Sequence, residues 1–288
     1  MIGIIPAAGA GLRIQPLGCS KELLPVGSRL VDGIVRPKAV SEYLVERMIA
    51  AGARQICMVI SAEKSDIVRY YAERDYAAEI FYAVQRRPRG LCDALFRAAP
   101  FVRSDEPVLI GLPDTIWFPE NAYLTAVDAL GQVDFRPSDA VNGRDGDGHG
   151  EAEVNLVLFP VENPSVFDAV LCEVPSVPAV GVPGRDERRR VERVVVKQLN
   201  PGSHWVWGAV VTTGRAFHAL HQLWEARHRA DEFLGDLLNA YIAAGNPVQA
   251  APNGEHYMDV GTMEGYHAAQ DYLRERNRQS GEARASAA

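Results

Sequence analysis

The first 130 residues alternate between short apolar runs and segments whose apolar residues recur at helical spacing. Apolar runs of strand length occupy residues 2–7, 56–61, 80–84 and 108–112. Helical spacing occurs in the intervals, for example at Val40, Leu44 and Met48. Parallel strands need a crossover connection that is usually a helix, so this alternation predicts a Rossmann-like α/β fold. We expect a mixed, mostly parallel sheet with helices on both faces.

The second part of the chain continues the pattern less regularly. Residues 154–161, 191–197 and 206–212 read as strands, and Thr262 can cap a last helix with Glu264 in its first turn. Residues 132–153 are rich in Asp and Gly, but Asp145, Asp147 and His149 do not complete a calcium loop, so we interpret them as a surface loop. We predict one domain over residues 1–276, with halves at about 1–130 and 152–260. Residues 277–288 lack an apolar face and should fray.

Charge and cysteine content exclude several classes of protein. The 288 residues include 30 Lys and Arg against 37 Asp and Glu, a formal charge of −7, which is unlike a protein that coats a nucleic acid polymer. The four cysteines form no Cys-x-x-Cys pair and match no zinc pattern. No run approaches the roughly 18 apolar residues of a membrane span, and no signal peptide is visible. We therefore expect a cytoplasmic protein without membrane partners.

In parallel sheets of this kind, ligands bind beyond the carboxyl ends of the strands, so the loop after residue 7 is a candidate site. Ala8, Gly9 and Gly11 are small enough for backbone N–H groups to approach an anion, and Arg13 and Lys21 can neutralise it. Ile14 stands where a dinucleotide-binding fingerprint needs a third Gly, and the Gly-Lys-Ser/Thr of a Walker A loop is absent. The loop therefore suits a phosphate ligand of another kind.

The ordered set Gly9, Gly11, Arg13, Pro16, Lys21 and Pro25 resembles the N-terminal signature of the sugar-1-phosphate nucleotidylyltransferases. That signature reads Gly-x-Gly-Thr-Arg, then Pro, then Pro/Ser-Lys-x-Leu-x-Pro. The chain departs from it at Leu12, which replaces the usual Thr, and in an interval between Arg13 and Lys21 that is about two residues shorter. The resemblance implies that Arg13 and Lys21 hold a nucleoside triphosphate and act in catalysis.

Three further segments resemble the same family in the same order along the chain. They are residues 84–95 (VQRRPRGLCDAL), 109–117 (LIGLPDTIW) and 256–266 (HYMDVGTMEGY). The resemblance implies that Gln85 and Gly90 join Ala8, Gly9 and Gly11 in binding the nucleotide. It also implies that Asp114 and Asp259 bind Mg²⁺, with Asp114 counted among the catalytic residues. From the residues alone, Asp114 could instead cap a following helix.

The match is weaker in the middle of the chain. Residues 194–200 (VVVKQLN) keep the family's lysine as Lys197, but Val196 stands in place of a Glu that reads sugar hydroxyls. Residues 205–217 keep a glycine, Gly208, in the strand that lines the sugar site. The resemblance implies that Lys197 and Gly208 bind the sugar phosphate. Because Val196 cannot accept a hydrogen bond, we expect weak discrimination at the hydroxyl concerned.

The resemblance implies a nucleotidyltransferase fold of the GT-A-like type and an enzyme that forms a nucleotide-sugar and pyrophosphate. Its partners would be a pyrimidine nucleoside triphosphate, dTTP or UTP, and a sugar 1-phosphate, expected to be a hexose 1-phosphate, with Mg²⁺ as cofactor. A catalytically weak, nucleotide-sugar-binding regulatory relative is the alternative. A GT-A glycosyltransferase fits less well, because Asp114-Thr115-Ile116 is not the Asp-x-Asp motif. The oligomeric state stays open, a homo-oligomer included.

Overall fold

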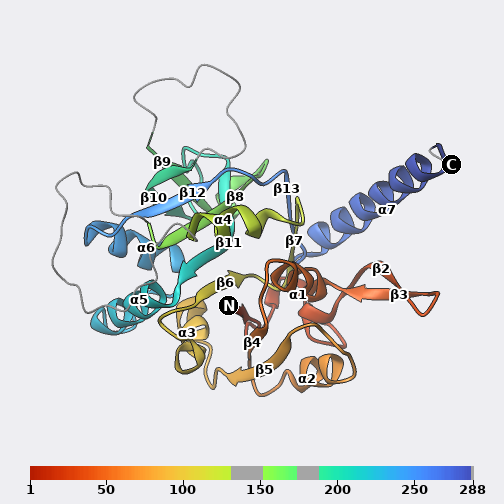
Figure 1. The fold of residues 1–288 in the computed structure, drawn as a ribbon, viewed down its shortest axis with the longest axis horizontal. Helices are drawn as coiled ribbons and strands as arrows, with labels where there is room; N and C mark the ends of the chain where they lie inside the picture. Colours follow the sequence, from red (N-terminus) through yellow and green to blue (C-terminus); the bar gives the residue numbers. More distant parts are fainter. Residues whose placement is uncertain (131–151, 174–187, 287–288) are drawn as a thin grey trace.

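The computed structural model describes residues 1–130, 152–173 and 188–286, and its centre is a nine-stranded sheet (Figure 1). Four adjacent strands from the first half are parallel to one another. In spatial order they are β5 (Glu79–Val84), β4 (Gln55–Ile60), β1 (Ile2–Pro6) and β6 (Pro107–Gly111). All four predicted strands of the first half are therefore present, in one parallel block.

The second half extends the same sheet with mostly antiparallel pairs. Its strands are β11 (Trp205–Thr213), β8 (Val154–Pro160), β12 (Val248–Ala251), β10 (Arg189–Val196) and β9 (Asp168–Cys172). Only β8 and β12 pair in parallel here. A mixed sheet is confirmed, whereas the predicted mostly parallel pairing holds for the first half. Between Val154 and Thr213 the described residues contain no α-helix that could serve as a crossover, so these strands return antiparallel.

Helices cover both faces of the sheet, as the alternation predicts. α3 (Gly90–Phe96), α5 (Gly214–Ala226) and α6 (Leu234–Ala243) contribute to one apolar cluster. α1 (Val40–Ala50), α2 (Ser65–Ala72) and α4 (Ala122–Leu130) contribute to a second. Within β1, Ile4 belongs to the first cluster and Ile5 to the second, because successive strand residues point to opposite faces. The strands are thus buried on both sides.

Several short elements escaped the sequence patterns. β2 (Pro25–Val31) and β3 (Ile34–Ala39) form a hairpin, and β7 (Thr115–Phe118) pairs with β13 (His256–Asp259). The 3₁₀ turns are η1 (Leu12–Ile14), η2 (Lys21–Leu23), η3 (Ala99–Phe101) and η4 (Pro164–Val166). A strand, not a helix, therefore follows Asp114, which excludes the reading of Asp114 as a helix cap.

The last helix, α7 (Met263–Ser286), projects from the body of the molecule (Figure 1). Its predicted cap is confirmed, since the Gly265 N–H donates to Thr262 Oγ1 at 3.1 Å. The helix extends to Ser286 and so includes residues 277–286 of the segment predicted to fray; the fraying itself stays a prediction. Side-chain pairs one turn apart, such as Arg278 with Glu275 at 2.8 Å, support the helix beyond Leu273, where it has no apolar face. Asp145, Asp147 and His149 lie outside the described residues.

Candidate active site

Two carboxylates from distant parts of the sequence meet at the edge of the sheet. Asp114 follows β6, and Asp259 ends β13, whose pairing with β7 sets Asp259 opposite Thr115. The backbone is also joined here, because the Val260 N–H donates to the Asp114 carbonyl at 2.8 Å. Pairing between β7 and β13, two strands that the sequence patterns missed, therefore brings the two predicted metal ligands together.

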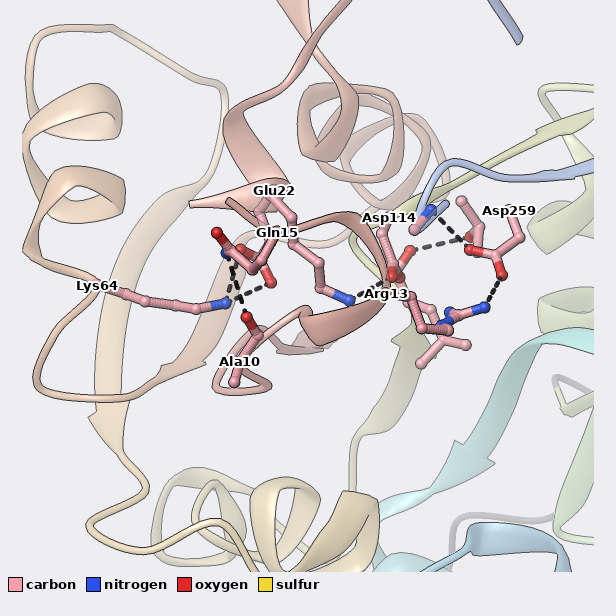
Figure 2. A network of polar contacts seen from close by, with 11 residues as sticks. Ala10, Arg13, Gln15, Glu22, Lys64, Asp114 and Asp259 are labelled. Atoms are coloured by element: carbon pink, nitrogen blue, oxygen red, sulfur yellow. Dashed lines mark hydrogen bonds and ion pairs between the residues drawn. The ribbon is translucent and has the colours of Figure 1, made fainter. Parts of the chain in front are cut away.

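Each of these carboxylates faces one of the two predicted basic residues (Figure 2). Arg13 Nη1 lies 2.9 Å from Asp259 Oδ2, and Lys21 Nζ is ion-paired with Asp114 Oδ2. Burial alone would lower the pKa of Lys21, but the carboxylates of Asp114, Glu22 and Asp259 outweigh it and raise the pKa above the ordinary value. Lys21 is thus a firmly charged ammonium group at the centre of the site.

Gly261 shows how closely these groups approach. A Cβ on Gly261 would stand 2.8 Å from Asp259 Oδ1 and 3.0 Å from Asp114 Oδ2, with Arg13 Nη2 at 2.9 Å. The Gly261 N–H itself donates to Asp259 Oδ1 at 2.8 Å. Both carboxylates and the guanidinium therefore border one small space, and any side chain at position 261 would intrude on it.

A buried ion pair between Glu22 and Lys64 anchors the loop that carries Arg13 and Lys21. Lys64 Nζ donates to both carboxylate oxygens of Glu22 at 2.7 Å, and Glu22 is 1% exposed. Burial raises the pKa of Glu22 and lowers the pKa of Lys64, and each partner opposes the shift of the other. Asp66 accepts hydrogen bonds at 2.6 Å from the backbone and the hydroxyl of Ser20. These contacts fix the backbone on both sides of Lys21.

A cavity of about 580 Å³ borders this centre at Lys21. Ala8, Lys21 and Gln85 line it, together with Arg86 and Pro88 from the loop after β5. Gln85 is buried, and its amide donates to Asp93 at 2.8 Å and to the Gly90 carbonyl at 3.2 Å. The orientation of the Gln85 side chain is therefore set by the protein before any ligand binds.

Gly9, Gly11 and Gly90 differ in the structural reason for which a glycine stands there. Gly11 has a φ of 65°, a conformation that favours glycine, and it starts the turn that carries Arg13. Gly9 is exposed, with nothing near the position of a Cβ. Gly90 has a φ of 86°, and a Cβ there would stand 2.7 Å from Glu232 Cα. The close approach that requires Gly90 is thus to the segment before α6, and Gly90 does not line the cavity.

A second cavity, of about 510 Å³, opens on the other side of the ion-paired centre. Its lining includes Arg13, Asp114 and Asp259 of the centre, together with Lys197, Asp168, Trp207 and Phe233. Lys197 Nζ lies 4.1 Å from the centre of the Phe233 ring, an arrangement that holds a cation without neutralising it. Gly208 does not line the cavity; a Cβ there would stand 2.5 Å from the Tyr257 ring, so it makes room for packing.

The two cavities meet at the ion pair of Lys21 with Asp114, since Lys21 borders the first and Asp114 the second. The structure thus brings together Arg13, Lys21, Asp114 and Asp259, and it places Gln85 and Lys197 on opposite sides of them. The sequence patterns missed Asp168, Glu22 and Lys64. In the sequence, Asp168 is a single acidic residue before a short apolar run, which is a weak signal. Glu22 and Lys64 were missed because charged side chains are usually exposed to solvent, so a pattern gives no reason to expect them buried.

Comparison with solved structures defines the class of fold. A UTP-bound UDP-glucose pyrophosphorylase (UGPase) from Acinetobacter baumannii superposes with a TM-score of 0.71 at 18% identity, over 98% of each chain. A UDP-glucose pyrophosphorylase complexed with UDP-glucose gives a TM-score of 0.70 over 96% of this chain and 98% of its own. The chain therefore has the mixed α/β fold of nucleotidyltransferases.

Sequence comparison is more specific. Residues 2–135 match the family described as nucleotidyl transferase. A glucose-1-phosphate thymidylyltransferase from Neisseria meningitidis is 28% identical over 95% of this chain and 82% of its own length. A UTP–glucose-1-phosphate uridylyltransferase from Mycoplasma pneumoniae is 28% identical over 48% of this chain and 55% of its own. The resemblance drawn from the motifs is confirmed, as is the prediction of an enzyme of the sugar-1-phosphate nucleotidylyltransferase class.

No helix in the described part of the chain is long and apolar enough to cross a membrane.

Proposed function

We propose that the chain joins a pyrimidine nucleoside triphosphate, dTTP or UTP, to a hexose 1-phosphate and releases pyrophosphate. One observation carries the proposal: two cavities meet at a centre of two carboxylates and two cations drawn from distant segments. Such a layout suits two phosphorylated substrates whose phosphates must be side by side. The thymidylyl- and uridylyltransferase relatives support a pyrimidine base.

On the nucleotide side, the backbone of Ala8, Gly9 and Gly11 would contact the nucleotide, and Gln85 would hydrogen-bond the base. Lys21 would bind the triphosphate once a phosphate oxygen replaces Asp114 as its partner. Arg13 is 58% exposed as a side chain and free to turn toward the same phosphates. A contact from Gly90 is not supported by its position against Glu232, so we assign the base to Gln85 alone.

The donor set at the centre fits Mg²⁺. Two carboxylates border one small space, and Mg²⁺ prefers one or two carboxylates together with waters and substrate phosphates to a full set of protein ligands. No group of three or more His, Cys, Asp or Glu suited to a metal occurs in the described residues, which agrees with a site that substrate oxygens complete. We propose Asp114 and Asp259 as the ligands. A bound Mg²⁺ would offset phosphate charge and so favour approach of the two substrates.

The reaction needs positioning more than a protein nucleophile. An oxygen of the sugar 1-phosphate would attack the α-phosphorus of the triphosphate in line with the departing pyrophosphate. Lys197, on the wall of the second cavity, would hold the sugar phosphate, and Gly208 would act through the packing of Tyr257. Lys21 and Arg13 would stabilise the charge that develops on the phosphate oxygens.

The decisive test is metal-dependent pyrophosphate release. With dTTP or UTP and glucose 1-phosphate, turnover should vanish in EDTA and return with Mg²⁺. Asp114→Asn and Asp259→Asn should each lower turnover by about 10²-fold or more, because each removes a hard-cation ligand. Asp105→Asn, which changes an exposed carboxylate paired with Arg103, should leave turnover unchanged. Turnover that persists in EDTA would contradict the metal site. Nucleotide-sugar binding without turnover would favour the regulatory alternative.

A further inference from the structure

The sugar-side cavity contains a carboxylate that the motifs do not account for. Val196, where the resemblance implies a Glu, lies in β10, and its partner across the antiparallel pair with β9 is Asp168. Residues directly opposite in an antiparallel pair share one face of the sheet. A Cβ on Gly235 would stand 2.7 Å from Val196 Cγ2 and 3.2 Å from Asp168 Oδ2, so both side chains meet the first turn of α6. A carboxylate, that of Asp168, therefore lies on the adjacent strand beside the position where the family has a Glu.

Asp168 lines the cavity, and its carboxylate can accept more hydrogen bonds than the surrounding described residues donate. Trp207 Nε1 donates to Asp168 Oδ2 at a long 3.4 Å. Asp168 Oδ1 is buried and has no hydrogen-bond partner among the described residues. Burial raises the pKa of Asp168, and Trp207 and Lys197 oppose that shift. A buried carboxylate oxygen without a donor is costly, so the geometry calls for a donor that this part of the protein does not supply.

The other walls of the cavity show what kind of donor fits. Lys197, Phe233 and Trp207 line the same cavity as Asp168 and contribute one cation and two aromatic side chains, a lining suited to a ligand with both an anionic group and a ring that carries hydroxyls. Rotation about the Cβ–Cγ bond of Asp is soft, so either oxygen can turn toward the cavity. A hydroxyl group would supply the missing donor.

We propose that Asp168 is the specificity-determining residue of the sugar site, where it accepts a hydrogen bond from one hydroxyl of the hexose 1-phosphate. The inference rests on the function proposed above. It replaces the expectation of weak discrimination drawn from Val196, because the carboxylate has moved to the adjacent strand instead of being lost. Discrimination against a sugar that lacks this hydroxyl should be strong, since the buried carboxylate would then stay unpaired.

The experiment compares glucose 1-phosphate with its 2-, 3-, 4- and 6-deoxy analogues, each with saturating dTTP or UTP and Mg²⁺. For the unmodified enzyme, one analogue should show kcat/KM about 10- to 100-fold below glucose 1-phosphate. In Asp168→Ala, glucose 1-phosphate should fall by a similar factor while that analogue stays unchanged, so the ratio approaches one. Asp168→Asn, which keeps one acceptor oxygen, should give an intermediate ratio.

A matched control separates this role from general electrostatics and from folding. Asp236→Ala removes an exposed carboxylate from the first turn of α6 and should leave every ratio unchanged. Thermal unfolding of each variant checks that the fold survives, and the isosteric Asn variant keeps the test informative if the Ala variant unfolds. An equal loss for all five sugars in both Asp168 variants would show that Asp168 supports Lys197 or α6 instead, and would overturn the inference.

Failure of the inference is distinguishable from failure of the proposed function. An unmodified enzyme that turns over all five sugars equally well contradicts the role of Asp168 but upholds the reaction. An unmodified enzyme that releases no pyrophosphate with any of the five sugars and either nucleotide overturns both.

Discussion

Lys21 is the side chain that links the two cavities through its ion pair with Asp114. It borders the first cavity, its ion-pair partner Asp114 borders the second, and the buried pair of Glu22 with Lys64 fixes its backbone. A charge held in place by buried neighbours costs little reorganisation when phosphate charge develops nearby. Arg13, by contrast, is mostly exposed and reaches the centre from a 3₁₀ turn. The two cations should therefore differ in how much catalysis depends on them.

At the residue scale, Lys21→Ala should lower kcat/KM by about 10²–10³-fold, the usual effect of removing a charge-assisted contact to a transition state. Arg13→Ala should lower kcat/KM by a smaller factor, because its guanidinium is largely solvated. Steady-state pyrophosphate release measures both. Arg103→Ala, which changes an exposed arginine away from the cavities, serves as the control. A Lys21→Ala enzyme with near-normal kcat/KM would remove this loop from the phosphate site.

At the scale of elements, α7 has two parts with different roles. Its first turns pack into an apolar cluster with η1 and β2, where Leu273 is 6% exposed and lies near Gly27. Tyr266 and Gln270 also donate to the Pro25 carbonyl at 3.1 and 2.9 Å. The helix thus braces Pro25 and Gly27, which follow the loop of residues 8–21 (the proposed phosphate loop), while the turns beyond Leu273 are held by exposed charge pairs.

Leu273→Ala should lower the free energy of unfolding by about 2–5 kcal/mol, because it empties a buried leucine site beside the phosphate loop. Arg274→Ala, one residue further on, should change it by less than about 0.5 kcal/mol, since an exposed pair contributes little. Urea unfolding followed by circular dichroism compares the two variants. Equal effects from both would mean that α7 does not brace the body through Leu273.

At the scale of the whole molecule, the nine-stranded sheet joins a parallel half to a mostly antiparallel half, and Asp114 follows β6, the strand at their border. The proposed halves at about 1–130 and 152–260 stay a prediction. Because the phosphate loop, Asp114 and Asp259 come from segments far apart in the chain, a ligand that bridges them should stabilise the folded state as a unit.

A nucleotide at about 100 times its Kd should stabilise the protein by about 2.7 kcal/mol, or on the order of 5 °C in Tm. We expect that shift with UTP or dTTP in the presence of Mg²⁺, and a reduced one in Lys21→Ala. Differential scanning fluorimetry across UTP, dTTP, ATP and GTP measures it. A larger shift with ATP or GTP than with either pyrimidine nucleotide would contradict the proposed base.

Much of the fold and part of the site follow from the sequence alone. Buried parallel strands such as β1 and β4 are short, nearly continuous apolar runs, so their composition and length identify them without knowledge of the neighbouring strands. Gly11, Arg13, Lys21, Asp114 and Asp259 stand in short ordered motifs that predict a phosphate and metal site. The paired basic and acidic side chains at the centre are the residues that these motifs indicated.

Tertiary structure decided what depends on contacts between distant segments. β7 and β13 are four residues each and form a two-stranded sheet with each other, so neither has a local pattern strong enough to reveal it. Asp168 and Val196 are 28 positions apart and become neighbours only through strand register. A register is a property of two strands, not of either one. The sequence by itself therefore determined the class of enzyme and the parallel strands of the first half, whereas pairing between strands decided which carboxylates meet at the centre and which one lines the second cavity.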